Sequence, residues 1–138
     1  MSKWINVPND LSSYYGFVYK ITIKTNNKKY IGRCNFWKIV KRPPLKGKKN
    51  RRYIKKETDW RNYYGSGGKE WQKIIKQVGK DNIKREILIL CKTPWEVKYK
   101  EAELQFREKV LLKEEYYNGI IQLKLPKAPK NLRIKDGR

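Results

Sequence analysis

The chain has 138 residues, with 35 Lys and Arg against 13 Asp and Glu and a formal net charge of +22 at pH 7. It has no His and only two Cys, which excludes His-based acid–base catalysis, a Ser-His-Asp triad, an all-Cys zinc site and a disulfide scaffold. Five Trp and ten Tyr are too many aromatic residues for a disordered basic tail. The composition therefore predicts one folded basic domain that binds a polyanion, either nucleic acid or an anionic membrane.

The apolar runs and the N-terminus argue against the membrane. The longest apolar run, Ile87 to Cys91, is far shorter than the roughly 20 residues that a membrane span needs. No apolar stretch follows Met1 to Trp4, so we expect no signal peptide. Reduced cysteines without an export signal favour the cytoplasm.

The beginning of the chain predicts a β-hairpin. Residues 1–14 carry turn-forming residues and are expected to be an irregular lead-in. Apolar residues alternate along 16–24 with the period of a half-buried strand. Turn residues at 25–28 lead into a second strand at 29–32. The residues expected on the buried face of the first strand are Phe17, Tyr19, Ile21 and Ile23.

A strongly basic segment, 41–58, follows the hairpin. Residues 41–56 hold nine Lys or Arg and no acid, and Pro43-Pro44 disfavours a helix. A solvated charge run is the simplest interpretation of such a stretch. Inside a folded domain, however, this charge density is costly unless phosphates neutralise it, so we expect a DNA-binding loop. The phosphate-binding candidates are Lys46, Lys48, Lys49, Arg51 and Arg52.

The second half predicts a helix at 69–78, a strand at 83–90, a longer helix from Pro94 to near Glu115, and an extended basic tail at 123–138. The order of elements predicts a small α/β (α+β) sandwich over 15–122, with a central three-stranded antiparallel sheet flanked by helices. The apolar stripe expected on the longer helix is Tyr99, Ala102, Phe106 and Val110.

Two short motifs lie on the predicted hairpin. The first is Phe17-Val18-Tyr19, preceded by Gly16, and the second is Tyr30-Ile31-Gly32. Their tyrosines, Tyr19 and Tyr30, are eleven residues apart. The chain resembles the GIY-YIG nuclease superfamily in its phage-type, homing-endonuclease-like branch over about residues 15–120. The further matching segments are 63–67, 79–82, 85–88, 101–106 and 116–118.

The resemblance implies a Mg²⁺-dependent DNA endonuclease, with Mn²⁺ as a possible substitute, that leaves 5′-phosphate and 3′-hydroxyl ends. Duplex DNA is the expected partner. One active site per chain implies that a monomer nicks or cuts twice in succession, whereas a concerted break needs a DNA-induced dimer. A phage-encoded protein of this kind would act in the cytoplasm of the host cell.

Site roles also follow from the resemblance. It implies that Tyr19 is a general base or positions water, and that Tyr30 holds the substrate or shares that role. It implies a single Mg²⁺ ligand at Glu101 and an orienting role for Asn118, and Tyr64 stands where many relatives have His or Tyr. A phenol has a pKa of about 10, but a hydrated divalent metal and several cations beside it would make its phenolate accessible.

Two of the roles have competing candidates. The family's essential arginine usually follows the YIG glycine at a position where this chain has Val40. Arg33 and Arg42 are therefore equal candidates for the catalytic arginine, and Arg51 and Arg52 rank behind them.

Glu103 competes with Glu101 for the metal because Glu103 lies close in angle to the predicted apolar stripe. Glu101 better fits the family's Glu-Ala-x-x-Gln-Phe pattern, and we favour it.

Two other functions fit the composition. One is a non-catalytic basic nucleic-acid-binding module, and the other is a nuclease directed at RNA or at a particular DNA structure. Binding alone does not require the ordered set Tyr19, Tyr30, Glu101 and Asn118, so this set favours the nuclease.

Overall fold

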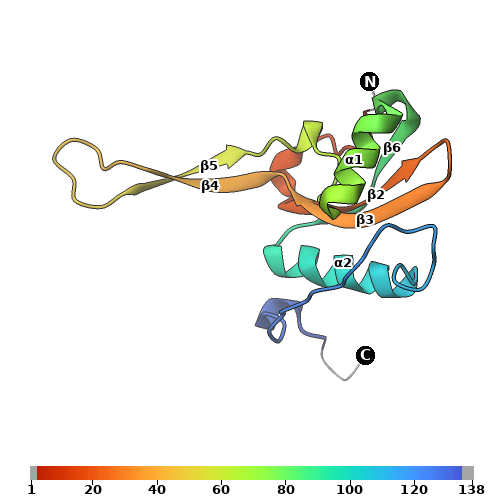
Figure 1. Cartoon of the computed structure of the whole chain (residues 1–138). Coiled ribbons are helices and arrows are strands. Elements are labelled where there is room, and N and C mark those ends of the chain that lie inside the picture. The colour runs from red at the N-terminus through yellow and green to blue at the C-terminus, as the bar shows by residue number, and fades with distance from the viewer. Residues whose placement is uncertain (1–2, 135–138) are drawn as a thin grey trace.

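A four-stranded sheet forms the centre of the computed structural model, which describes residues 3–134 (Figure 1). Its strands are β1 (Trp4–Ile5), β2 (Gly16–Ile23), β3 (Lys28–Asn35) and β6 (Ile83–Cys91), in the order β1-β6-β2-β3. β2 runs antiparallel to both of its neighbours, whereas β1 is parallel to β6. β3 is therefore an edge strand.

The sheet has a fourth strand, β1, so the prediction of a three-stranded sheet was wrong. β1 lies within residues 1–14, which were predicted to be irregular. Trp4 is only 8% exposed, its ring packs edge-on against Phe17 at 5.0 Å between centroids, and its Nε1 donates a hydrogen bond to the Trp60 carbonyl at 2.9 Å. A short 3₁₀ helix, Leu11–Ser13, follows, and the Asp10 side chain caps it. A strand of two residues is too short to produce an alternating pattern, so periodicity could not reveal it.

One helix covers each face of the sheet (Figure 1). α1 (Gly68–Val78) packs Trp71 and Ile75 against the β2 row of Phe17, Tyr19, Ile21 and Ile23, as the helical and alternating patterns predict. α2 (Pro94–Arg107) packs Val97 and Leu104 on the opposite face, against Val18 and Ile31. Three further 3₁₀ turns are Trp60–Asn62, Lys80–Asn82 and Lys130–Leu132.

α2 differs from its prediction in length and in orientation. It begins as predicted, with Thr93 accepting a hydrogen bond from the Glu96 N–H, but it ends at Arg107 rather than near Glu115. Two members of the expected stripe face solvent, with Tyr99 43% and Phe106 64% exposed, whereas Ala102 and Val110 are buried as expected. The row that faces the sheet is instead Val97, Glu101 and Leu104, spaced i, i+4 and i+7.

The basic segment, predicted to be a loop, instead contains two β-strands. β4 (Trp37–Arg42) and β5 (Arg52–Glu57) pair as an antiparallel hairpin that projects from the body of the molecule (Figure 1). We call residues 37–57 the arm and residues 43–51 its tip. The arm strands contain Ile39, Val40, Tyr53 and Ile54, which favour β structure, but the cations between them obscure the alternation. The five predicted phosphate-binding residues lie exposed at the tip and at the start of β5.

The described part of the tail packs against α2 instead of extending away from it. Trp95 Nε1 donates a hydrogen bond to the Pro126 carbonyl at 2.9 Å. Residues 135–138, with the expected cations Lys135 and Arg138, lie outside the described residues. Between residues 3 and 134, no helix is long and apolar enough to cross a membrane.

Candidate active site

The outer edge of β3 is covered by side chains and by the segment after α2. Lys29 donates its backbone N–H to the Glu115 carbonyl at 2.7 Å and accepts from the Tyr117 N–H at 2.8 Å. Backbone groups of alternate residues point to the same edge of a strand, so the next positions along this edge are Ile31 and Arg33. Both are held by predicted site residues.

Asn118 holds the backbone of Ile31. Asn118 is 8% exposed, its Oδ1 accepts from the Ile31 N–H at 3.0 Å, and its Nδ2 donates to the Ile31 carbonyl at 2.7 Å. Gln105 Nε2 donates to the same carbonyl at 2.9 Å. The resemblance implies that Asn118 orients the site, and the structure places its amide on the strand residue between Tyr30 and Gly32. Gln105 is a second holder that sequence reasoning did not single out.

Glu101 holds Arg33, the next residue along the edge. Arg33 Nη1 lies 3.0 Å from Glu101 Oε1 and donates a hydrogen bond to it. The Glu101 side chain is 16% exposed and that of Arg33 is 38% exposed. Burial raises the pKa of Glu101, and Arg33 opposes this shift.

The competing candidates lie elsewhere. Glu103 faces solvent and pairs with Lys100 at 3.5 Å. Arg42 lies on the arm, opposite Arg52 in the β4–β5 register. The structure therefore brings Arg33 and Glu101 together and brings neither Arg42 nor Glu103 to them.

Tyr30 projects from β3 toward α1, where its ring stacks on Trp71 at 5.4 Å between centroids. Burial is the largest cause of the raised pKa of Tyr30. Glu101 raises this pKa further, whereas a contact with the Ser66 hydroxyl and the charge of Arg33 lower it. The charges of Arg33 and Glu101, on the α2 side, therefore act on the Tyr30 phenol across the edge of the sheet.

Tyr19 lies beneath Gly32. A Cβ at Gly32 would stand 2.5 Å from the Tyr19 hydroxyl oxygen, so only glycine fits at this point of the YIG motif. Tyr19 is 0% exposed, and its hydroxyl has no hydrogen-bond partner among the described residues. Burial raises its pKa well above 10, and the neighbouring phenols Tyr63 and Tyr30 add to this shift. The sequence predicts a phenolate made accessible by cations, whereas the structure has a buried neutral phenol among other phenols.

Tyr63 and Tyr64 lie in different surroundings. The predicted site residue, Tyr64, stacks on the Arg85 guanidinium at 4.1 Å, in a hollow away from Arg33. Tyr63 instead packs on Tyr19 at 5.8 Å between centroids and lines a hollow with Arg33. Two adjacent aromatic residues gave no sequence signal to distinguish them. Downstream, Gly67 lets this loop lie on Tyr30, because a Cβ there would be 2.9 Å from Tyr30 Cε2.

Arg33 lines two surface hollows. One, of about 360 Å³, extends over Cys34 and Tyr63 to Thr58 at the root of the arm. The other, of about 560 Å³, lies between Arg33 and the chain after α2, where its lining includes two more cations. These are Lys98 and Lys124. The Cys34 thiol in the first hollow is not a nucleophile at neutral pH, because burial raises its pKa to about 12.

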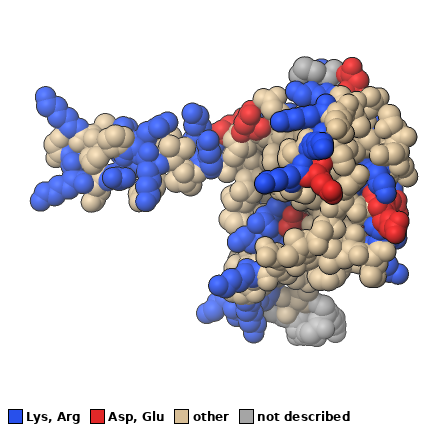
Figure 2. Space-filling model, viewed as in Figure 1, with Lys and Arg blue, Asp and Glu red and all other residues tan. Residues whose placement is uncertain are grey.

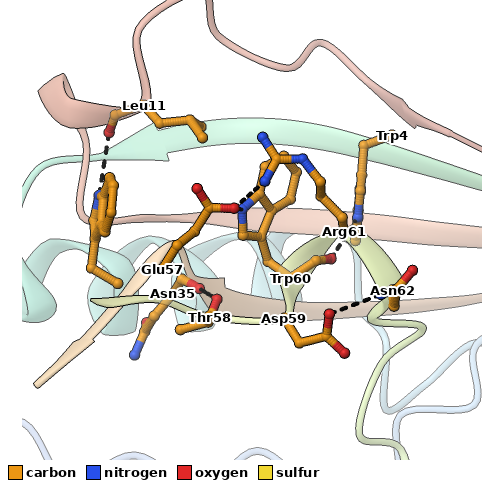
Figure 3. A network of polar contacts seen from close by, with 10 residues as sticks. Trp4, Leu11, Asn35, Glu57, Thr58, Asp59, Trp60, Arg61 and Asn62 are labelled. Atoms are coloured by element: carbon orange, nitrogen blue, oxygen red, sulfur yellow. Dashed lines mark hydrogen bonds and ion pairs between the residues drawn. The ribbon is translucent and has the colours of Figure 1, made fainter. Parts of the chain in front are cut away.

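Polar contacts fix the root of the arm beside the first hollow (Figure 3). Thr58 Oγ1 donates to the Asn35 carbonyl at 2.6 Å, and Trp60 Nε1 donates to Glu57 at 3.2 Å. Arg61 forms an ion pair with the same Glu57 carboxylate. On the other side of the root, Trp37 Nε1 donates to the Leu11 and Tyr14 carbonyls at 3.3 and 3.1 Å. The arm therefore leaves the body in a set direction next to Arg33.

Residues 3–121 match the family described as "Putative endonuclease segE, GIY-YIG domain". The chain belongs to this GIY-YIG family. The match covers the sheet, both helices, the arm and Asn118, and it confirms the resemblance seen in the sequence. No curated protein and no solved structure matches the chain. Membership of the GIY-YIG family implies a nuclease of the endonuclease kind, with a nucleic acid as its substrate.

The GIY-YIG site offers a divalent ion one carboxylate. Among residues 3–134, no group of three or more Asp, Glu or Cys side chains could hold a metal ion. Mg²⁺ typically takes one or two protein carboxylates and completes its shell with water and substrate phosphate oxygens. Glu101 is one carboxylate, 16% exposed and paired with Arg33, so it fits an ion of that kind and does not fit a closed metal cage.

Proposed function

We propose that this chain is a Mg²⁺-dependent DNA endonuclease that hydrolyses phosphodiester bonds to 5′-phosphate and 3′-hydroxyl ends. The observation that carries this proposal is the Arg33–Glu101 ion pair at the edge of β3, the strand that also carries Tyr30. Hydrolysis of a diester needs a positioned water, a group that takes its proton, and positive charge for the phosphorane. These three side chains supply such groups without histidine.

Arg33 would bind the scissile phosphate. Its side chain is 38% exposed and lines two hollows, and a planar guanidinium matches two phosphate oxygens. In the free chain this group pairs with Glu101. Binding of a phosphate would draw Arg33 from that pair and leave Glu101 Oε1 available.

Glu101 would then hold the Mg²⁺ ion. The ion, when bound, supplies positive charge to the phosphate and to the leaving oxygen. Because Glu101 and Arg33 are neighbours at the edge of β3, an ion on Glu101 would lie close to a phosphate bound by Arg33.

Tyr30 would orient the attacking water and, as a phenolate, take its proton, the role that the resemblance gives to Tyr19 with a share for Tyr30. Loss of the phenol's own proton to solvent would be favoured by the charge of Arg33 and by a Mg²⁺ ion held by Glu101. Burial raises the pKa of Tyr30, but the contact with Ser66 and the charge of Arg33 oppose this shift, whereas every cause given for the raised pKa of Tyr19 acts in the same direction. Tyr19 and Asn118 would position the strand that carries Tyr30, one by packing under Gly32 and the other by holding Ile31.

Supercoiled plasmid tests the proposal. Wild-type protein with Mg²⁺ should nick the plasmid, EDTA should prevent nicking, and Mn²⁺ should restore it. Glu101→Gln should give no detectable nicking, whereas the matched variant Glu103→Gln, on the exposed side of the same helix, should cut within a few-fold of wild type. Nicks that DNA ligase seals without prior kinase treatment would verify the 5′-phosphate and 3′-hydroxyl ends.

Plasmid that binds but stays intact in both metals would contradict the nuclease and favour a non-catalytic binding module. Activity kept in Glu101→Gln and lost in Glu103→Gln would transfer the metal to Glu103.

A further inference from the structure

The arm is exposed on both of its faces. Ile39 is 65%, Tyr53 64% and Ile54 40% exposed. The arm extends into solvent away from the two helices, and Lys and Arg side chains cover much of it (Figures 1 and 2). An isolated two-stranded hairpin is marginally stable in water, so a partner that covers one face would stabilise it.

The register divides the arm residues between two faces, because residues directly opposite each other on paired strands lie on the same face. One face, which we call the cationic face, carries three cross-strand pairs. These pairs are Lys38 with Lys56, Val40 with Ile54, and Arg42 with Arg52. The other face, which we call the aromatic face, carries Trp37 with Glu57, Ile39 with Lys55, and Lys41 with Tyr53.

Cations on the aromatic face already have partners within the arm. Lys55 Nζ lies 4.6 Å from the centroid of the Trp37 ring, and Lys41 Nζ lies 5.9 Å from that of Tyr53. Such contacts between a cation and an aromatic ring are attractive. The arm's one acid, Glu57, also belongs to this face, at the root.

Like charges stand opposite each other on the cationic face. Lys38 faces Lys56, and Arg42 faces Arg52. Directly opposed like charges destabilise a strand pair, and no acid shares this face to compensate for them. The apolar pair Val40 and Ile54 lies between the two charged pairs. The missing compensation points to a polyanion as the partner of this face.

We propose that the cationic face of the arm lies across the major groove of duplex DNA, with one like-charge pair on the phosphates of each side and Val40–Ile54 over the groove. The two pairs are four residues apart along β4. At about 3.4 Å per residue this separation is about 14 Å, close to the roughly 12 Å width of the major groove, which admits a two-stranded ribbon. This inference rests on the proposed function, which makes duplex DNA the substrate.

Two double variants with the same loss of charge test the choice of face. Arg42→Gln/Arg52→Gln removes two cations from the cationic face, and Lys41→Gln/Lys55→Gln removes two from the aromatic face of the same strands. Binding to a fluorescent duplex is measured by anisotropy in EDTA over a series of salt concentrations. We expect the log–log salt slope of the cationic-face variant to become shallower by about two units, since each duplex phosphate contributes about 0.9. The aromatic-face variant should keep the wild-type slope.

Lys38→Gln/Lys56→Gln serves as a second cationic-face variant with the same expectation, and circular dichroism verifies that each variant is folded. Equal slope changes for the two faces would overturn the inference, because the arm would then act through net charge alone. So would a slope unchanged in all the variants. Plasmid nicking by the wild type is followed in parallel. If the wild type nicks plasmid but the variants of the two faces show equal salt slopes, only the choice of face is wrong. If the wild type neither binds the duplex nor nicks plasmid, the proposed function is wrong.

Discussion

The body and the arm differ in how far their side chains are buried and in how their charges are paired. In the body, large rings such as Trp60, Trp71 and Tyr19 are buried almost completely, and hydrogen bonds hold the outer edge of β3 at Lys29 and Ile31. In the arm, apolar side chains are exposed and like charges oppose each other. Buried contacts therefore fix the positions of the proposed site residues in the body, whereas the arm has few such contacts and would gain them from the DNA partner that we propose.

The largest effect expected in the body concerns the Tyr30 hydroxyl. Tyr30→Phe should lower the rate of cleavage at saturating DNA by at least about a hundredfold, the low end for a general base, with DNA affinity almost unchanged. Tyr64→Phe is the matched control, because its ring stacks on Arg85 away from Arg33, and it should cut at close to the wild-type rate. Single-turnover cleavage and anisotropy measure the two quantities. A Tyr30→Phe enzyme within a few-fold of wild type would show that Tyr30 only packs.

A smaller effect should separate the stability of the body from that of the arm. Asn118→Ala leaves the buried Ile31 N–H without a partner, which costs about 1–3 kcal/mol of unfolding free energy. Asn50→Ala, at the exposed arm tip, should change that free energy by less than about 0.5 kcal/mol. Urea denaturation followed by Trp fluorescence measures both. Equal stability of the two variants would mean that Asn118 does not hold β3.

The smallest effect is a shift in one titration. Burial raises the pKa of Glu101 above its usual 4.5, so the folded state binds this proton more tightly than the unfolded chain does, and the stability that the group contributes is lost as pH rises through the folded pKa. Because Arg33 opposes the shift, Arg33→Gln should raise the pKa of Glu101 further. Arg42→Gln, on the arm, should leave it unchanged. NMR titration of ¹³C-labelled Glu carboxyl groups measures both values, and a lower pKa in Arg33→Gln would contradict the ion pair.

Sequence reasoning succeeded where one periodic signal dominated. The β2 row of Phe17, Tyr19, Ile21 and Ile23 and the α1 row beginning at Trp71 lie on the faces that were predicted. It failed for β1, which has two residues, and for the arm strands, where cations interrupt the apolar pattern. It also predicted the wrong buried face for α2, because the apolar residues Tyr99 and Phe106 are exposed.

The candidate site shows a similar division. Motif order selected Tyr30, Glu101 and Asn118, but spacing could not choose between Arg33 and Arg42, since that choice depends on the path of the arm. Spacing also could not show that Tyr19 is buried beneath Gly32, because the burial of a side chain depends on tertiary packing. The Gln105 contact with Ile31 depends on which face of α2 is turned toward the sheet, and the predicted apolar stripe gave that face wrongly.

The covered edge of β3 also restricts how two copies of this chain could associate. Exposed strand edges can pair with neighbouring molecules, but the backbone groups of Lys29 and Ile31 on this edge are already hydrogen-bonded. Their partners are Glu115, Tyr117 and Asn118. At the opposite edge of the sheet, β1 offers only two residues. A continuous sheet shared between two copies is therefore disfavoured at both edges. Two copies that cut opposite strands would therefore meet through surfaces other than the edges of this sheet, or would be aligned by the DNA alone.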